Sequence, residues 1–254
     1  MRTKIVIALW LVGCARPVAP GVHVAEPPRV ASAPPAPVPD PAPVAEVAPA
    51  PKTCTYGARG TTTQFEIVAP CTHVNDSVAS CARATLAVRD SSGAEIQRFD
   101  LESACVVLAE DGKLLEGSTA LYDAQSTIVP GDFDFDGRED FAVQVGDDGP
   151  YGGPTFDVYL RDASGKFVRS EPFSQITRET LGMFQVDVSK KRLVTMAKGG
   201  CCWHQTEVLA IERGAPKPVE RFTEDATGDD VVVETHEVLV GKTWRRTVKR
   251  HKQP

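Results

Sequence analysis

The sequence has 254 residues, which is enough for one or two domains. It carries 28 Lys and Arg residues against 34 Asp and Glu residues, and the formal net charge of −6 at pH 7 excludes the general basic character of nucleic-acid-binding proteins. Many of the 20 Pro residues are concentrated towards the N-terminus, which indicates that this part of the chain differs from the rest.

The first thirteen residues read as an export signal. Two basic residues, Arg2 and Lys4, precede an apolar run over residues 5–12, which is far too short for a permanent membrane-spanning helix. The sequence Leu-Val-Gly-Cys at residues 11–14 resembles the lipobox of bacterial lipoprotein signal peptides. This resemblance implies that Cys14 becomes the lipidated N-terminus. An ordinary secretory signal cleaved near Ala15 is the alternative, and the chain is exported in either case.

The residue after Cys14 bears on the destination of the protein. It is Ala15 in place of Asp, and by resemblance to known lipoproteins this implies sorting to the outer membrane. We therefore expect an outer-membrane lipoprotein that is attached to the membrane through its lipid anchor. Its domain is expected to face the periplasm in preference to the cell surface.

Residues 14–53 have the composition of a linker. Twelve Pro and ten Ala residues occur between residues 15 and 53, and prolines lack the amide donors that helices and sheets need. We expect an extended, partly polyproline-II tether between the lipid and the domain, with an upper reach on the order of 100 Å at ~3 Å per residue. A role as a PxxP ligand is the less favoured alternative. The folded domain is then residues 54–254.

Short β-prone runs separated by turn signals recur through this domain. Strands are predicted over residues 61–68, 84–89, 94–99, 105–109, 118–129, 141–145, 156–161, 166–169, 186–188, 193–196, 207–212, 231–240 and 243–249. Hairpin turns are expected at residues 90–93 and 162–165, and one short helix at residues 175–181. The pattern favours an all-β domain of many short antiparallel strands, in a sandwich or an irregular β-propeller-like arrangement. A regular propeller is not supported, because no strict internal repeat is found.

The segment GDFDFDGREDF at residues 131–141 has the oxygen spacing of a calcium loop. Carboxylates occupy loop positions 1, 3, 5 and 9, a glycine occupies position 6, and position 7 can offer its backbone carbonyl. These residues are Asp132, Asp134, Asp136, Asp140, Gly137 and Arg138. Position 12 is Val143, where an EF-hand has Glu. The alternation of Phe141, Val143 and Val145 predicts that a strand follows the loop, and not a helix.

Four converging carboxylates favour a bound cation. Two carboxylates ~4 Å apart repel by about 1 kcal/mol in bulk water and by about 4 kcal/mol at an effective dielectric near 20, and Arg138 alone cannot neutralise four of them. Hard oxygen ligands in this number suit Ca²⁺ better than Mg²⁺. The alternative is an acidic hairpin with solvated aspartates. Phe133 and Phe135 are expected to point away from the carboxylates and to anchor the loop to the core.

The sequence GDFDFDGREDFAV resembles the calcium loop of FG-GAP and integrin-α-type repeats. More narrowly, residues 128–169 resemble a family of periplasmic lipoproteins with a single such loop, and the resemblance extends loosely to residues 173–181 and 220–244. Characterised members are immunity proteins of antibacterial type IV secretion systems. The resemblance implies a β-propeller-like fold and inhibition of lysozyme-like effectors. The cysteines and the Pro/Ala-rich linker are not part of the family pattern.

Two further segments are candidates for binding a protein partner. The sequence GDDGPYGGP at residues 146–154 indicates an irregular backbone, and its Tyr151 is of a type enriched at interfaces. Asp147 and Asp148 are further contact candidates, with additional calcium ligation as an alternative role. Trp203 and His204 are candidate contact residues, with core packing as their alternative. A flexible turn is the alternative for residues 146–154.

Six cysteines are left once Cys14 is set aside, and an even number in an exported chain predicts disulfide bonds. They are Cys54, Cys71, Cys81, Cys105, Cys201 and Cys202. A disulfide between adjacent residues is strained, so we expect Cys201 and Cys202 to pair with two cysteines of residues 54–105. A vicinal disulfide and a zinc site with His204 are the less favoured alternatives.

No catalytic motif accompanies the five histidines, so an enzyme is not expected. The tail at residues 242–252 (KTWRRTVKRHK) is locally basic, which predicts a last strand with a charged solvent face; a dedicated anionic partner is the alternative.

The leading hypothesis is a lipid-anchored, calcium-stabilised envelope protein that binds a protein partner. The partner would be a peptidoglycan hydrolase, whose cleft receives loop residues such as Tyr151. The second hypothesis is a structural or adhesive envelope module in which calcium and disulfides provide rigidity only.

Overall fold

The computed structural model describes residues 51–71, 80–228 and 230–252. The predicted signal peptide, the predicted lipidation site Cys14 and nearly all of the predicted linker lie outside the described residues. Within the described ranges, no helix is both long and apolar enough to cross a membrane.

The first sheet consists of four consecutive antiparallel strands. They are β1 (Thr53–Arg59), β2 (Thr63–Pro70), β3 (Ser80–Asp90) and β4 (Glu95–Val106). Buried and half-buried residues alternate along β2, so that Phe65 and Ile67 enter the core. The Asp90 carboxylate accepts hydrogen bonds from the N–H groups of Ser92 and Ala94, which closes the predicted hairpin turn.

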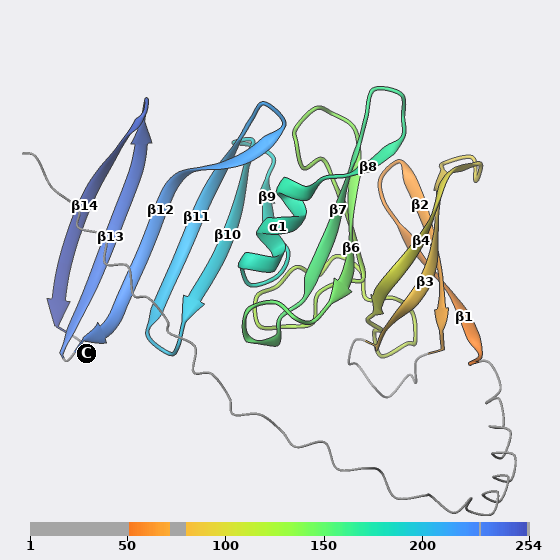
Figure 1. Ribbon diagram of the computed structural model, residues 1–254, viewed down its shortest axis with the longest axis horizontal. Coiled ribbons are helices and arrows are strands. Elements are labelled where there is room, and N and C mark those ends of the chain that lie inside the picture. Colours follow the sequence, from red (N-terminus) through yellow and green to blue (C-terminus); the bar gives the residue numbers. More distant parts are fainter. Residues whose placement is uncertain (1–50, 72–79, 229, 253–254) are drawn as a thin grey trace, which may run out of the picture. The chain divides into compact units, whose positions relative to one another are not determined.

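The second sheet lies between the other two (Figure 1). Its strands are β5 (Ile128–Gly131), β6 (Asp140–Gly146), β7 (Thr155–Arg161) and β8 (Phe167–Arg169). Strand β6 is buried on both faces, since Phe141 and Val143 pack in the core shared with the first sheet and Ala142 packs in the core shared with the third. Phe141 stacks on Tyr159 with ring centroids 4.8 Å apart. A run of apolar residues without polar alternation is the pattern of such a doubly covered strand.

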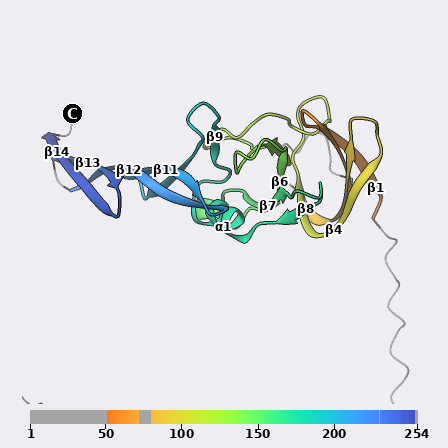
Figure 2. The ribbon, with the colours of Figure 1, turned by 90° about the horizontal axis from the view of Figure 1, so that it is seen from above.

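The third sheet has six antiparallel strands in the order β14-β13-β12-β11-β10-β9. They are β9 (Gln185–Asp187), β10 (Arg192–Gly199), β11 (Trp203–Glu212), β12 (Ala215–Gly228), β13 (Val231–Val240) and β14 (Thr243–Lys252). Leu193 and Leu209 of this sheet are buried in the core that it shares with the second sheet, which is called the second core below. Seen from above in Figure 2, β11–β14 extend beyond the helix α1 as a single layer.

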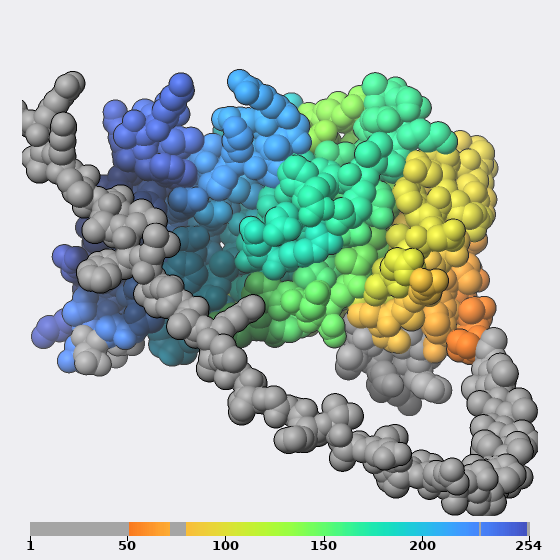
Figure 3. Space-filling model, in the orientation of Figure 1, coloured from red at the N-terminus to blue at the C-terminus, as the bar shows by residue number. Residues whose placement is uncertain are grey.

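Helix α1 (Glu171–Glu179) packs on β7 and is prominent in the space-filling view of Figure 3. Its Phe173 side chain is fully buried in the second core. The hydroxyls of Ser174 and Thr177 accept hydrogen bonds from the backbone N–H groups of Val158 and Phe156, at 2.9 Å each. The helix therefore supplies polar partners to β7 as well as apolar cover.

The all-β fold class is confirmed, and three separate antiparallel sheets, with no closed barrel among the described strands, fit the sandwich arrangement. Several predicted elements are wrong in detail. Residues 118–127 are not a strand. The segment 105–109 does not form a strand of its own, because β4 ends at Val106 and residues 107–109 lie outside it. The helix begins at Glu171. The sequence pattern does not predict strands β1 and β12.

Candidate functional site

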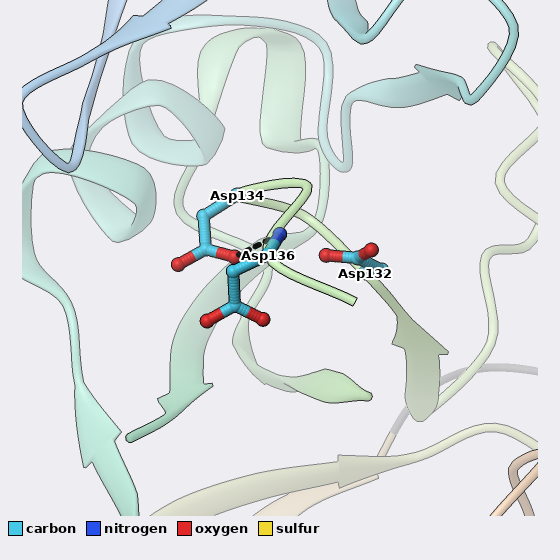
Figure 4. A group of neighbouring side chains, drawn as sticks. All are labelled: Asp132, Asp134 and Asp136. Atoms are coloured by element: carbon cyan, nitrogen blue, oxygen red, sulfur yellow. Dashed lines mark hydrogen bonds between the residues drawn. The ribbon is translucent and has the colours of Figure 1, made fainter. Parts of the chain in front are cut away.

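The aspartate loop between β5 and β6 brings three carboxylates together. Asp132, Asp134 and Asp136 each offer one oxygen, and these oxygens lie within 4.8 Å of one another (Figure 4). All three residues come from one turn of backbone, so the spacing in the sequence alone determines their convergence. Three of the four carboxylates predicted as calcium ligands therefore form one group.

Backbone hydrogen bonds wrap the loop around this group. The N–H of Gly137 donates to Asp132 Oδ2 at 3.0 Å, and the N–H of Asp136 donates to Asp134 Oδ1 at 3.1 Å. Gly137 has a φ of +88°, in the left-handed region that a residue with a Cβ rarely adopts. The predicted sharp turn at loop position 6 is therefore present.

The charges of the group are only partly compensated. The guanidinium of Arg138 forms an ion pair with Asp136 and donates through Nε to the Arg161 carbonyl at 2.8 Å. Asp132 Oδ1 is buried and has no hydrogen-bond partner among the described residues. Burial raises the pKa of Asp134, and repulsion from Asp136 and Asp132 adds to the rise, against the Asp136 N–H and Arg138, which lower it. An orphaned buried carboxylate oxygen beside two further carboxylates fits a hard cation.

The fourth predicted ligand, Asp140, lies outside this group. It is fully buried, and its Oδ2 and Oδ1 accept hydrogen bonds from the N–H groups of Phe133 and Arg161 at 2.8 Å each. Burial raises the pKa of Asp140 to about 7, and the neighbouring Asp134 and Asp136 contribute to the rise, while the two N–H donors lower it. The carboxylate of Asp140 thus holds the two ends of the loop against β7. Ligation by Asp140 and by the Arg138 carbonyl stays a prediction.

Glu139 also belongs to this loop, at position 8, which is not a calcium-ligand position. Its carboxylate accepts hydrogen bonds from the N–H groups of Thr61, Thr62 and Thr63, at 2.5–2.9 Å, and from the hydroxyls of Thr62 and Thr63 at 2.8 Å each. Burial alone would raise the pKa of Glu139, but these donors outweigh burial and lower it. The loop is thereby fixed to the β1–β2 turn of the first sheet.

The phenylalanines of the loop anchor it to the second core, as predicted. Phe133 is fully buried and meets Phe184 edge to face, with ring centroids 5.2 Å apart. Phe135 is partly buried against the same core. The crowding of aspartates beside phenylalanines thus reflects two faces of one turn, with charges on one side and apolar rings on the other.

The glycine-rich loop at residues 147–154 follows β6 and is closed by its own backbone. The N–H of Gly149 donates to the Gly153 carbonyl at 3.0 Å, and a 3₁₀ turn covers Pro150–Gly152. Tyr151 within this turn has a φ of +61° and is 61% exposed. A bulky residue in the left-handed region is uncommon.

Tyr151 is joined to the β10–β11 hairpin of the third sheet. The N–H of Gly200 donates to the Tyr151 hydroxyl oxygen, and Lys198 Nζ lies 4.4 Å from the centre of the Tyr151 ring. The same ammonium lies 4.7 Å from the centre of the ring of Tyr122, which is 65% exposed and also has a positive φ. Two exposed tyrosines on two loops therefore flank one lysine. This set, Tyr122, Tyr151 and Lys198, is called the tyrosine pair surface below.

The cysteine pairing corrects the expectation for Cys201 and Cys202. These two residues form a vicinal disulfide at the tip of the β10–β11 hairpin, and do not pair with cysteines of residues 54–105. The other disulfides are Cys54–Cys71 and Cys81–Cys105, both within the first sheet. Each of the six thiols is used, so a zinc site with Cys201 and Cys202 is excluded in this oxidised form.

The remaining predicted contact residues are spread around this hairpin. Trp203 and His204 follow the vicinal disulfide and are half-buried, so neither is a fully exposed contact residue. Asp147 and Asp148 are exposed in the Tyr151 loop, and Asp148 Oδ1 accepts a hydrogen bond from the Thr155 hydroxyl at 2.9 Å. They lie at the end of β6 opposite to the aspartate loop, about 20 Å away at ~3.3 Å per strand residue. A role in the same metal site is therefore excluded.

A groove of about 550 Å³ lies on one face of the third sheet. His236 Nε2 lies 2.6 Å from Glu220 Oε1, and the His236 ring stacks on Phe222 with centroids 4.1 Å apart. Among the described residues, no hydrogen bond joins His204 or His236 to a Ser, Thr or Cys side chain that could act as a nucleophile. The prediction that the protein is not an enzyme stays a prediction.

Comparison with known proteins shows the fold. No family model matches the sequence, and no curated protein matches it either. A solved structure described as that of a Xanthomonas type IV secretion system related protein is similar in fold, with a TM-score of 0.60 and 24% sequence identity. The match covers 76% of this chain and 92% of the Xanthomonas chain. At this identity the likeness establishes a shared all-β architecture.

Proposed function

We propose that this protein is an envelope lipoprotein, associated with a type IV secretion system, that binds and inhibits a peptidoglycan hydrolase. The observation that carries the binding part of the proposal is the tyrosine pair surface. Tyr151 is exposed, yet its backbone is closed by hydrogen bonds and its hydroxyl is held by Gly200. A side chain that is ordered before binding loses little conformational entropy on entering a partner's cleft.

The chemistry of this surface suits the active-site cleft of a carboxylate-based glycosidase. Such a cleft contains paired Asp or Glu residues, and Lys198 supplies a positive charge between two aromatic rings that can pack on apolar walls. The similarity in fold to the Xanthomonas protein, together with the lipobox-like sequence at residues 11–14, supports the envelope and secretion-system parts of the proposal.

Calcium is proposed as a structural ligand of the aspartate loop. Asp132, Asp134 and Asp136 would hold the ion, which would supply the positive charge that the group lacks. The ion would stabilise the aspartate loop of the second sheet. Through Glu139, this loop is bonded to Thr62 and Thr63 of the first sheet. Its proposed role is to keep the central sheet rigid, with the tyrosine pair surface at the other end of β6.

The test measures inhibition of purified lysozyme-fold muramidases by the full chain in millimolar calcium. Tyr151→Ala is expected to weaken inhibition by roughly 30-fold or more, because a central interface tyrosine is worth about 2 kcal/mol or more. Phe222→Ala is the matched control, since Phe222 is a 50% exposed aromatic residue on the third sheet and should leave inhibition unchanged.

Two outcomes would contradict the proposal in different ways. If the wild-type chain neither binds nor inhibits any such muramidase, the hydrolase partner is wrong. A deletion strain with altered surface adhesion and normal resistance to hydrolases would then favour the structural or adhesive module. If inhibition occurs and Tyr151→Ala matches the wild type, the partner is right and the surface is wrong.

A further inference from the structure

Strand β14 forms a free edge of the third sheet (Figure 1). It pairs with β13 over its whole length, from Val240↔Thr243 to Val231↔Lys252. Among the described strands, none pairs with its other edge. The backbone N–H and C=O groups along that edge are therefore available to an additional strand.

The edge strand carries a concentrated positive charge, and β13 places only Glu234 and Glu237 opposite it. Its basic residues are Arg245, Arg246, Lys249, Arg250 and Lys252, all exposed, and the strand contains no Asp or Glu. None of them forms an ion pair with a carboxylate of the described residues, whereas arginines of the other two sheets do, as Arg89, Arg98 and Arg169 show. The chain as a whole has a net charge of −6, so this strand is a local exception.

The positive charges project from both faces of the sheet. Because side chains alternate along a strand, Arg245 and Lys249 lie on one face and Arg246 and Arg250 lie on the other. A flat anionic surface lying against the sheet would meet only one of these sets. A strand added at the edge brings side chains beside both sets at once, and it also satisfies the free backbone groups.

We propose that the edge of β14 is a docking site for an extended acidic segment of a partner protein, which adds to the third sheet as a further strand. The basic residues form two adjacent pairs, Arg245 with Arg246 and Lys249 with Arg250, and two neutral residues separate the pairs. This spacing favours a segment in which two pairs of carboxylates are likewise separated by two neutral residues. A second copy of this chain does not fit, since two β14 edges would oppose like charges. This surface is separate from the tyrosine pair surface, so its test is independent of the proposed function.

The test uses the full chain and a fluorescent peptide, Thr-Val-Asp-Glu-Thr-Val-Asp-Glu-Thr-Val, in an anisotropy titration. The peptide is expected to bind, and binding is expected to weaken as salt is raised, because the charges are exposed. The double variant Arg246→Glu with Arg250→Glu should weaken binding by roughly tenfold or more. Lys191→Glu is the control, since Lys191 is exposed in the β9–β10 turn and should leave binding unchanged.

Two comparisons separate strand addition from simple charge attraction. A peptide that keeps the four carboxylates and has proline at each Thr and Val position cannot form a strand ladder, and should bind at least roughly tenfold more weakly. Equal binding of the proline peptide would overturn strand addition. Binding to vesicles with anionic headgroups, without binding to the first peptide, would overturn the acidic-segment partner. The variant Arg245→Gln with Lys249→Gln repeats the test if the charge reversal fails to fold by circular dichroism.

Discussion

Strands β6 and β14 have the same antiparallel geometry and opposite surroundings. Strand β6 is covered on both faces, and five of its seven residues are buried. In β14 only Trp244 is half-buried, and every other residue is exposed. The central sheet, with its tied loops, holds the fold, while the outer strands of the third sheet present surface at little energetic cost to the rest of the domain.

The largest expected effect tests the central strand against the edge strand. Phe141→Ala removes a fully buried ring that contacts Phe65 and Tyr159, and should lower the free energy of unfolding by about 3–5 kcal/mol. Val248→Ala on β14, where the residue is 42% exposed, should change it by less than about 0.5 kcal/mol. Urea unfolding of both variants measures the difference. Equal losses would show that the outer strands are as integral to the core as β6.

A second, smaller effect concerns the link between the first two sheets. Glu139→Gln keeps the size of the side chain and removes the charge that Thr61, Thr62 and Thr63 surround, and should cost about 2 kcal/mol in the free energy of unfolding. The control is Glu102→Gln, because the Glu102–Arg83 pair is exposed and should contribute little. If both variants unfold at the same urea concentration, the Glu139 contacts do not stabilise the domain.

The smallest effect is that of the proposed cation. Millimolar calcium at a site with a dissociation constant of ~0.1 mM should add about 1.4 kcal/mol, which a thermal melt with and without EGTA can resolve. Asp134→Ala should abolish the shift, while Asp123→Ala, an exposed aspartate outside the loop, should keep it. An unchanged melting temperature in the wild-type chain would contradict the calcium assignment.

Sequence pattern predicts the strands whose own residues determine their burial. The alternation in β2 and the apolar run of β6 are local signals of this kind. Strand β12, by contrast, contains prolines and charges at irregular positions, and its extended form depends on pairing with β11 and β13. The prediction of a strand over residues 118–127 is wrong, because Gln125 and Thr127 instead use their side chains to bond the backbone of Met183 and Val107.

The candidate sites likewise divide into contacts that are local in the sequence and contacts between residues that are distant in it. Spacing in the sequence is sufficient for the three converging aspartates and the turn at Gly137, because these contacts are local. Glu139 occupies a loop position that is not a ligand position, and its partners lie 76–78 residues away in the chain, so no local signal points to it. The tyrosine pair surface likewise depends on the meeting of two sheets, which no local pattern encodes.

The Cys54–Cys71 disulfide has a mechanical consequence. It lies at the open end of the β1–β2 hairpin, where Cys54 stands opposite Ala69. A pull on the chain ahead of Thr53 would otherwise separate β1 from β2 one residue pair at a time, beginning at that end. The covalent bond instead carries the load from Cys54 directly to Cys71, so the six residue pairs from Cys54↔Ala69 to Arg59↔Gln64 are not peeled apart. Tension arriving from the N-terminal side is thus borne by a sulfur bridge and not by hydrogen bonds.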